Sequence, residues 1–139
     1  MTPLIVELHR WMGLPHIWGE TDCMMVLGDW VEKVTGIDPA ADLRFTYDSR
    51  GSCQKETGFY RDPVGVAAKY FEGVANLKRG NDLRAGDVAI IIRLDGVRPE
   101  PSGAVWLGTA WGCKGPNGTT TLSPKLVQVQ AFWSVGYEN

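Results

Sequence analysis

Cys23 is the residue whose type and position point most directly to chemistry. It follows Thr21-Asp22, either of which can cap a helix, and it begins an apolar stripe that continues through Leu27, Trp30 and Val34. Backbone N–H groups and the helix dipole at such a position lower the pKa of a thiol and favour the nucleophilic thiolate. The alternative interpretation, which composition alone favours, is a small apolar residue of the core.

A hydrolytic cysteine also needs a base to take its proton and an acid for the leaving group. The chain has only two histidines, His9 and His16. His16 lies seven residues before Cys23 and follows Pro15 in a turn, so this loop could bring the imidazole to the thiol. We favour a His16 ring that packs beside Trp18. Asp22 could orient a base, but its position favours a helix cap.

The cysteines show no pattern typical of a metal site or a disulfide framework. Cys53 and Cys113 lie far from Cys23 and from each other in the sequence, and no C-x-x-C pair occurs. Cys113 falls in a glycine-rich run over 112–118, so we expect a loop thiol there. We expect no metal ion, no cofactor and no disulfide.

The elements that must position these residues are helices first and strands later. Apolar spacing and end signals predict helices over 3–12, 23–35 and 63–72, and the polar segment 42–58 predicts a loop with a helical turn. Segment 76–85 also predicts a loop. Strands are predicted over 88–93, 103–111 and 126–135, with a hairpin at Asp95-Gly96 and a turn over 112–118. Pro99 and Pro101 predict a loop or a sheet edge. This order predicts an α+β fold.

Length and composition exclude several classes of protein. A chain of 139 residues with 44% hydrophobic residues is expected to fold as one domain over 1–139 without disulfides. The net charge of −2 provides no basic excess, which argues against a nucleic-acid binder. The longest aliphatic run, 88–92, is too short for a membrane span, which needs about 20 residues. Residues 1–10 lack a signal-peptide pattern, so we expect a protein kept in a cytoplasm.

The region that leads into Cys23 resembles the active-site region of NlpC-type cell-wall peptidases, which are papain-like cysteine amidases. Trp18-Gly19 and Asp22-Cys23 match that family, and Gly86-Asp87-Val88 resembles the start of its Gly-Asp-Val strand. The chain is also similar to a phage and prophage family of NlpC-like tail proteins. In that family Thr-Gly-x-Asp-Pro, here 35–39, precedes an arginine and an aromatic residue, here Arg44 and Tyr47. The resemblance spans residues 8–135.

This resemblance implies an NlpC-like fold, with N-terminal helices packed on a small antiparallel sheet or partial barrel. Cys23 would hold the nucleophile position at a helix N-terminus. The peptidases place their histidine at the start of the strand after the Gly-Asp strand, where this chain has Ser102 or Gly103. No histidine follows His16, and Thr109 is a weak match to the third polar residue.

The implied function is a structural component of a phage tail tip or baseplate whose catalytic set has decayed. The implied partners are other tail proteins, such as the hub and the tape-measure protein, and the implied location is the virion, assembled in the host cytoplasm. The alternative is an active cysteine peptidase or amidase that cleaves host peptidoglycan during infection, using Cys23 with His16 and Asp22. A third interpretation, a cytoplasmic cysteine enzyme with a small acyl substrate, rests on fold analogy alone.

Overall fold

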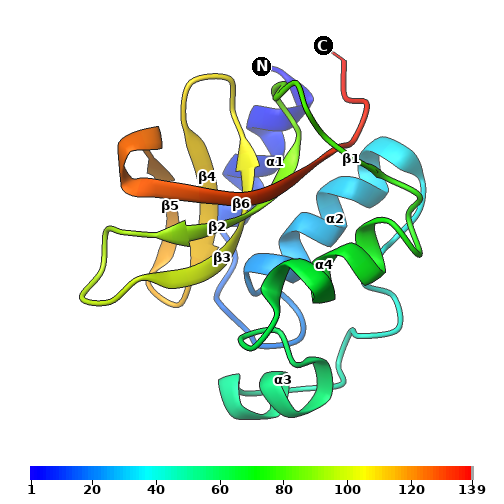
Figure 1. The fold of residues 1–139 in the computed structure, drawn as a ribbon. Coiled ribbons are helices and arrows are strands. Elements are labelled where there is room, and N and C mark those ends of the chain that lie inside the picture. The colour runs from blue at the N-terminus through cyan, green and yellow to red at the C-terminus, as the bar shows by residue number, and fades with distance from the viewer. Residues whose placement is uncertain (139) are drawn as a thin grey trace.

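The computed structural model describes residues 1–138 and has an α+β fold, as the sequence predicts. In this part of the chain, four α-helices pack beside a six-stranded antiparallel sheet (Figure 1). The four α-helices come first in the chain and all six strands of the sheet follow them. The chain therefore completes its helical layer before the strands that cover it.

The first two helices begin and end at the residues that the sequence indicates. α1 (Pro3–Met12) has Thr2 as its N-cap. α2 (Cys23–Thr35) has Asp22 as its N-cap and ends at Gly36, whose φ is 83°. A left-handed residue ends a helix by redirecting the backbone, and glycine adopts this conformation without a clash at Cβ.

The polar segment 42–58 contains a whole helix, which corrects the prediction of a loop with a helical turn. α3 (Arg50–Thr57) begins at a capping box formed by Ser49 and Ser52. Only Cys53 of this helix is buried, so apolar spacing could not indicate it. α4 (Pro63–Phe71) agrees with the helix predicted over 63–72.

The sheet has the spatial order β1-β6-β2-β3-β4-β5, and every neighbouring pair is antiparallel. The strands are β1 (Lys78–Arg79), β2 (Val88–Arg93), β3 (Glu100–Trp106), β4 (Trp111–Gly115), β5 (Gly118–Leu122) and β6 (Val127–Ser134). β2 and β3 form the hairpin predicted at 95–96. β6 comes last in the chain but lies between β1 and β2 (Figure 1).

Several strands differ from the predicted ones. β3 includes Pro101, which is tolerated because β4 pairs only with Val105 and Trp106 and leaves that edge of the strand open. β4 and β5 form a hairpin across the predicted turn 112–118, and β1 lies in the predicted loop 76–85. Cys113 is therefore a buried strand residue, 1% exposed, and the prediction of a loop thiol is wrong.

Both faces of β2 are buried, as its continuous apolar run predicts. Val88 and Ile90 point into the larger apolar cluster, which contains residues of the helices, whereas Ala89 and Ile91 point into a smaller cluster with Trp111. α1 contacts β4 and β5, α2 contacts β3, and α4 contacts β2 and β6. Because α2 lies against β3, its N-terminal end brings Cys23 to the sheet. α3 lies apart from the sheet in Figure 1.

Candidate active site

Asp22 fixes the N-terminus of α2. Its Oδ1 accepts hydrogen bonds from the backbone N–H groups of Met24 and Met25, each at 3.1 Å. Its Oδ2 accepts from the Gly19 N–H and the Tyr47 hydroxyl, each at 2.8 Å. The residue is 3% exposed, and all four donors are neutral groups. The structure therefore uses Asp22 as the helix cap that its position favours.

The residues that carried the phage-family resemblance surround this cap. Gly19 has a φ of 80°, and a Cβ there would lie 2.2 Å from the Tyr47 carbonyl oxygen, so the two loops meet only with glycine at this position. Arg44 bonds Asp38 at 2.8 Å and Asp29 of α2 at 2.8 Å. These contacts fasten the loop after α2 back onto the helix, which places Tyr47 beside Asp22.

Cys23 lies where the N-terminal end of α2 comes close to β3. A Cβ on Gly103 would lie 2.6 Å from Leu27 Cδ1 and 2.6 Å from Met24 Sδ, so a larger residue there would displace the ends of both side chains. The Ser102 side chain and the Gly103 backbone lie near enough to the Cys23 thiol to lower its pKa. Ser102 is itself 5% exposed, and its hydroxyl also donates to the Gly103 carbonyl at 2.9 Å. The position beside the thiol is therefore filled by a hydroxyl, which is a poor base at neutral pH.

The pKa of the Cys23 thiol is raised to about 12, first by burial and second by the negative charge of Asp22. The hydrogen bonds with Gly103 and Ser102 lower the pKa but do not offset these two effects. This result corrects the expectation that the helix N-terminus would lower the pKa of this thiol. At neutral pH the thiol keeps its proton and is a weak nucleophile.

His16 packs against Trp18, as we favoured, with ring centroids 4.8 Å apart and an angle of 87° between the ring planes. Burial lowers the pKa of His16, Asp22 raises it, and Lys114 lowers it, with a net decrease. His16 and Cys23 line the same cleft, but no hydrogen bond within residues 1–138 joins them. Thr109, the weak match to a third polar residue, lies in the exposed turn between β3 and β4.

Lys114 is a buried cation that sequence reasoning missed because it lies in the predicted turn. The residue is 1% exposed, and its Nζ donates to the carbonyl oxygens of Trp11 at 3.0 Å and Leu14 at 2.6 Å. Burial lowers its pKa. A cation bonded to the carbonyls at the end of α1 stabilises that helix end. It also fixes the start of the loop that carries His16.

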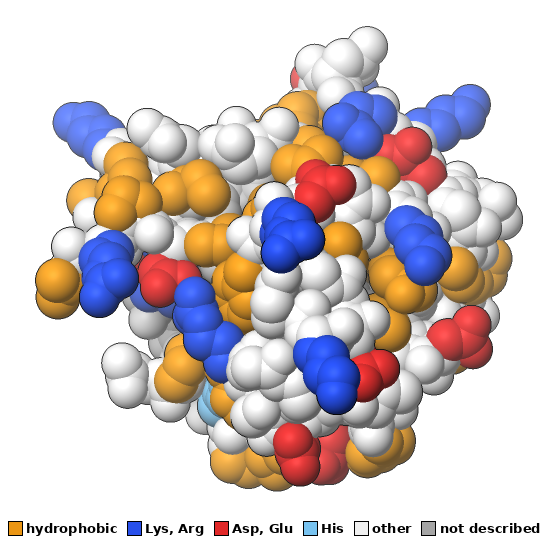
Figure 2. All heavy atoms as spheres, turned by 60° about the horizontal axis from the view of Figure 1, so that its bottom comes forward, with side chains coloured by type: hydrophobic (Ala, Val, Ile, Leu, Met, Phe, Trp, Pro, Cys, Tyr) orange, Lys and Arg blue, Asp and Glu red, His pale blue; other side chains and the backbone are white. Residues whose placement is uncertain are grey.

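A cleft of about 400 Å³ lies over the thiol. Its walls come from the loop before α2, from α3 and from the β2–β3 and β4–β5 hairpins. Arg50 of α3 pairs with Glu100 of β3 at 3.2 Å, and its guanidinium lies 4.0 Å from the centre of the Tyr60 ring. These exposed contacts connect two walls of the cleft. Figure 2 shows the face that carries α3, where basic and acidic side chains are spread among hydrophobic and uncharged ones.

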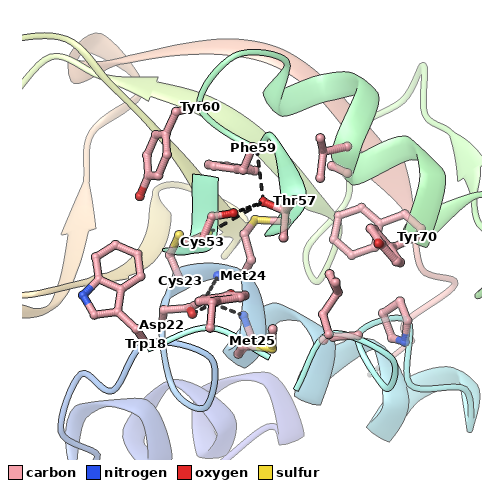
Figure 3. Close-up of a pocket in the computed structure, with 18 residues that line it drawn as sticks. Trp18, Asp22, Cys23, Met24, Met25, Cys53, Thr57, Phe59, Tyr60 and Tyr70 are labelled. Atoms are coloured by element: carbon pink, nitrogen blue, oxygen red, sulfur yellow. Dashed lines mark hydrogen bonds between the residues drawn. The ribbon is translucent and has the colours of Figure 1, made fainter. Parts of the chain in front are cut away.

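A second pocket of about 60 Å³ lies behind the cleft and is lined mainly by apolar side chains. Figure 3 shows Cys23 and Cys53 at this pocket, together with Tyr60 and Phe59. Burial is the main cause of the raised pKa of the Cys53 thiol. Cys23 lines both the cleft and this pocket, so its thiol lies at the boundary between a polar and an apolar space.

Residues 2–135 match a protein family described as Domain of unknown function (DUF6950). The chain belongs to this family. No curated protein and no solved structure matches the chain. The family match includes α2 with Cys23, the loop with Tyr47 and the strand with Ser102, so every wall of the cleft lies within the matched residues.

Two further findings concern ligands and membranes. Among residues 1–138, no group of three or more His, Cys, Asp or Glu side chains is arranged to hold a metal ion. In the same residues no helix has the length and apolar character that crossing a membrane requires.

Proposed function

We propose that this chain is a structural component of a phage tail tip or baseplate, with an NlpC-like fold whose hydrolytic site is inactive. The observation that carries the inactive site is the Ser102 hydroxyl beside the Cys23 thiol. In the sequence resemblance, Ser102 or Gly103 stands where the peptidases have their histidine. A hydroxyl neither takes the thiol proton nor protonates a leaving amine at neutral pH, and general acid–base help contributes about 10²–10⁴-fold to such reactions.

The motif residues support the NlpC-like part of the proposal. Trp18, Gly19, Arg44 and Tyr47 are among the residues that carry the resemblance, and all four contribute to the α2 N-terminus or to the wall beside it. This arrangement keeps the residues that would position a cysteine nucleophile, although no histidine stands in the place of the base. Such a site is expected in a protein that keeps a hydrolase scaffold for assembly. The proposed partners are other tail proteins, including the hub and the tape-measure protein.

The reactivity of Cys23 against pH tests the inactive site. In a Cys53→Ser, Cys113→Ser background, we expect the labelling rate of native protein to rise continuously beyond pH 9, because the thiol pKa is about 12. Rates in denaturant supply the free-thiol reference. A thiol pKa well below the ordinary value of about 8.5 would contradict the proposal. Clearing of peptidoglycan that is lost in Cys23→Ala would instead favour the active amidase that uses His16.

Ser102→His supplies a gain-of-function test. An imidazole at this position would lie beside the thiol and favour the thiolate, so we expect labelling at pH 7 to increase at least about tenfold. Ser102→Ala is the matched control, because it removes the hydroxyl without adding a base. If both variants label like the parent, residue 102 does not stand in the place of a catalytic base.

The tail role has a separate test. Mass spectrometry of purified particles from a phage or induced prophage that encodes this chain should detect it at a fixed ratio to the tail hub protein. Co-expression with the hub or tape-measure protein should yield a complex. Absence from the particles would contradict the tail role while leaving the inactive site unaffected.

A further inference from the structure

Phe45 is exposed in a way that the fold does not explain. Its side chain is 76% exposed, and no ring contact within residues 1–138 involves it. Ile17, which is 40% exposed, lies on the neighbouring loop. The two loops meet where the Phe45 N–H donates to the Gly19 carbonyl at 3.1 Å. An exposed aromatic residue on an ordered loop is typical of a residue that anchors a protein interface.

The backbone at Phe45 would accept a smaller residue more easily. Its φ is 64°, in the left-handed region that glycine and asparagine favour. In the turn before Phe45, the N–H groups of Leu43 and Arg44 donate to the Ala40 carbonyl. The chain reverses its direction after this turn, which allows Tyr47 to reach Asp22. The fold therefore needs the left-handed conformation at residue 45, but it does not need a phenyl ring.

Three acidic residues lie close to Ile17 and Phe45 in the sequence of the two loops. Glu20 follows Gly19, and Asp42 and Asp48 flank Phe45 at three residues on either side. All three residues are exposed, and none forms an ion pair within the described chain. Arg44, the basic residue between them, is engaged with Asp29 and Asp38. In Figure 2 hydrophobic side chains lie beside acidic ones along the lower edge of the face.

We propose that Phe45 and Ile17, with the carboxylates of Glu20, Asp42 and Asp48, form a docking surface for a partner protein with a basic surface around an apolar pocket. The apolar pair supplies buried area, and the three unpaired negative charges complement a basic rim and repel acidic surfaces. This surface is separate from the cleft, since Phe45 does not line it. The inference stands whether or not Cys23 is catalytically active.

Selection from a displayed library of random peptides tests this proposal with the whole protein as bait. We expect the selected peptides to be net basic and to carry apolar residues. Their binding should weaken roughly tenfold to thirtyfold in Phe45→Gly. Replacing the three carboxylates by amides should weaken binding and reduce its dependence on salt.

The controls separate docking from folding. Phe45→Gly and Phe45→Asn suit the left-handed backbone, so their melting temperatures should not fall below that of the wild type. Val97→Gly removes a fully exposed side chain from the β2–β3 hairpin and should leave binding unchanged. The proposal is overturned if no basic peptide is selected, if Phe45→Gly binds as well as the wild type, or if that variant loses much of its stability. Self-association of the chain that Phe45→Gly abolishes would assign the surface to a second copy and also overturn it.

Discussion

Glu7 and Asp22 are both buried carboxylates beside α2, but they bind different kinds of donor. Glu7 accepts from the Arg10 guanidinium at 2.7 Å and from the Trp11 indole at 3.0 Å, and it also pairs with Lys33. Asp22 accepts only from neutral N–H and hydroxyl groups. The charge of Glu7 is therefore balanced locally, whereas the charge of Asp22 acts on the groups around it.

The titration of the neighbouring groups reflects this difference. Burial raises the pKa of Glu7, but the hydrogen bonds from Arg10, Lys33 and Trp11 outweigh burial and leave a lowered pKa. Near Asp22, burial and then the Asp22 charge raise the pKa values of both Cys23 and Tyr47. One carboxylate stabilises charged partners, and the other keeps its partners neutral. The helix cap thereby opposes thiolate formation at the residue that follows it.

Asp22→Ala should cause the largest loss of stability, about 3–4 kcal/mol, measured by urea unfolding. The substitution leaves two helix N–H groups, the Gly19 N–H and the Tyr47 hydroxyl without their acceptor in a buried place. Asp22→Asn is the matched control, because its amide oxygen can still cap the helix, and it should lose about half as much. A loss below 1 kcal/mol for Asp22→Ala would mean that the cap is not important for stability.

Glu7→Gln should cost less, about 2 kcal/mol. The Arg10 and Lys33 side chains are 37% and 51% exposed, so they can turn to water when the carboxylate is removed. The same urea measurement checks this, and repeating it in high salt should reduce the difference between Glu7→Gln and the wild type. If Glu7→Gln destabilises the protein more than Asp22→Ala does, balanced and unbalanced carboxylates do not differ as we describe.

Alkaline pH should destabilise the protein through Cys23. Its pKa is about 12 in the folded protein and about 8.5 in an unfolded chain. Below pH 8.5 the thiol is protonated in both states, so it adds no pH dependence. Above this pH the unfolded state loses the proton first, and stability falls by up to about 1.4 kcal/mol per pH unit. Cys23→Ser should flatten the decline between pH 8.5 and 10, by about 1–2 kcal/mol in the free energy of unfolding. An unchanged slope would contradict the raised pKa.

Tyr47→Phe should have the smallest effect, about 1–1.5 kcal/mol. The change removes one of the four donors to Asp22 and keeps the buried ring. Thermal unfolding beside Tyr60→Phe, whose hydroxyl makes no bond to Asp22, isolates the contribution of the hydrogen bond. Equal losses in the two variants would show that the Tyr47 hydroxyl does not support the cap.

The helices of the core were predictable because their signals are local. Asp22 and Gly36 bound α2 where the sequence indicates, and the stripe from Leu27 to Trp30 is buried. α3 was not predictable from apolar spacing, since a capping box and one buried cysteine define it. The β4–β5 hairpin was hidden for another reason, because its glycines predict a turn although β4 and β5 pair directly with each other.

The position of the site was predictable, but its electrostatics were not. Asp22-Cys23 at a helix start and the lack of a histidine at 102–103 are visible in the sequence. The pKa of the thiol depends on burial, which arises only when distant segments pack, and on the charge of Asp22, whose lack of a cationic partner the sequence does not show. The bond from Tyr47 to Asp22 and the burial of Lys114 escaped notice because the partners of these residues lie 25 and 100–103 residues away.

The position of β6 also bears on how the molecule assembles in time. β6 is synthesised after the other five strands of the sheet, yet β2 pairs with it along Val88–Arg93. A nascent chain that ends before residue 127 can form the helices and the β2–β3 hairpin, but one edge of β2 stays without a partner. Contacts that join distant parts of a chain slow folding. β2 and β6 can therefore pair only after residues 127–134 have left the ribosome, and until then the exposed edge of β2 is open to pairing with other chains.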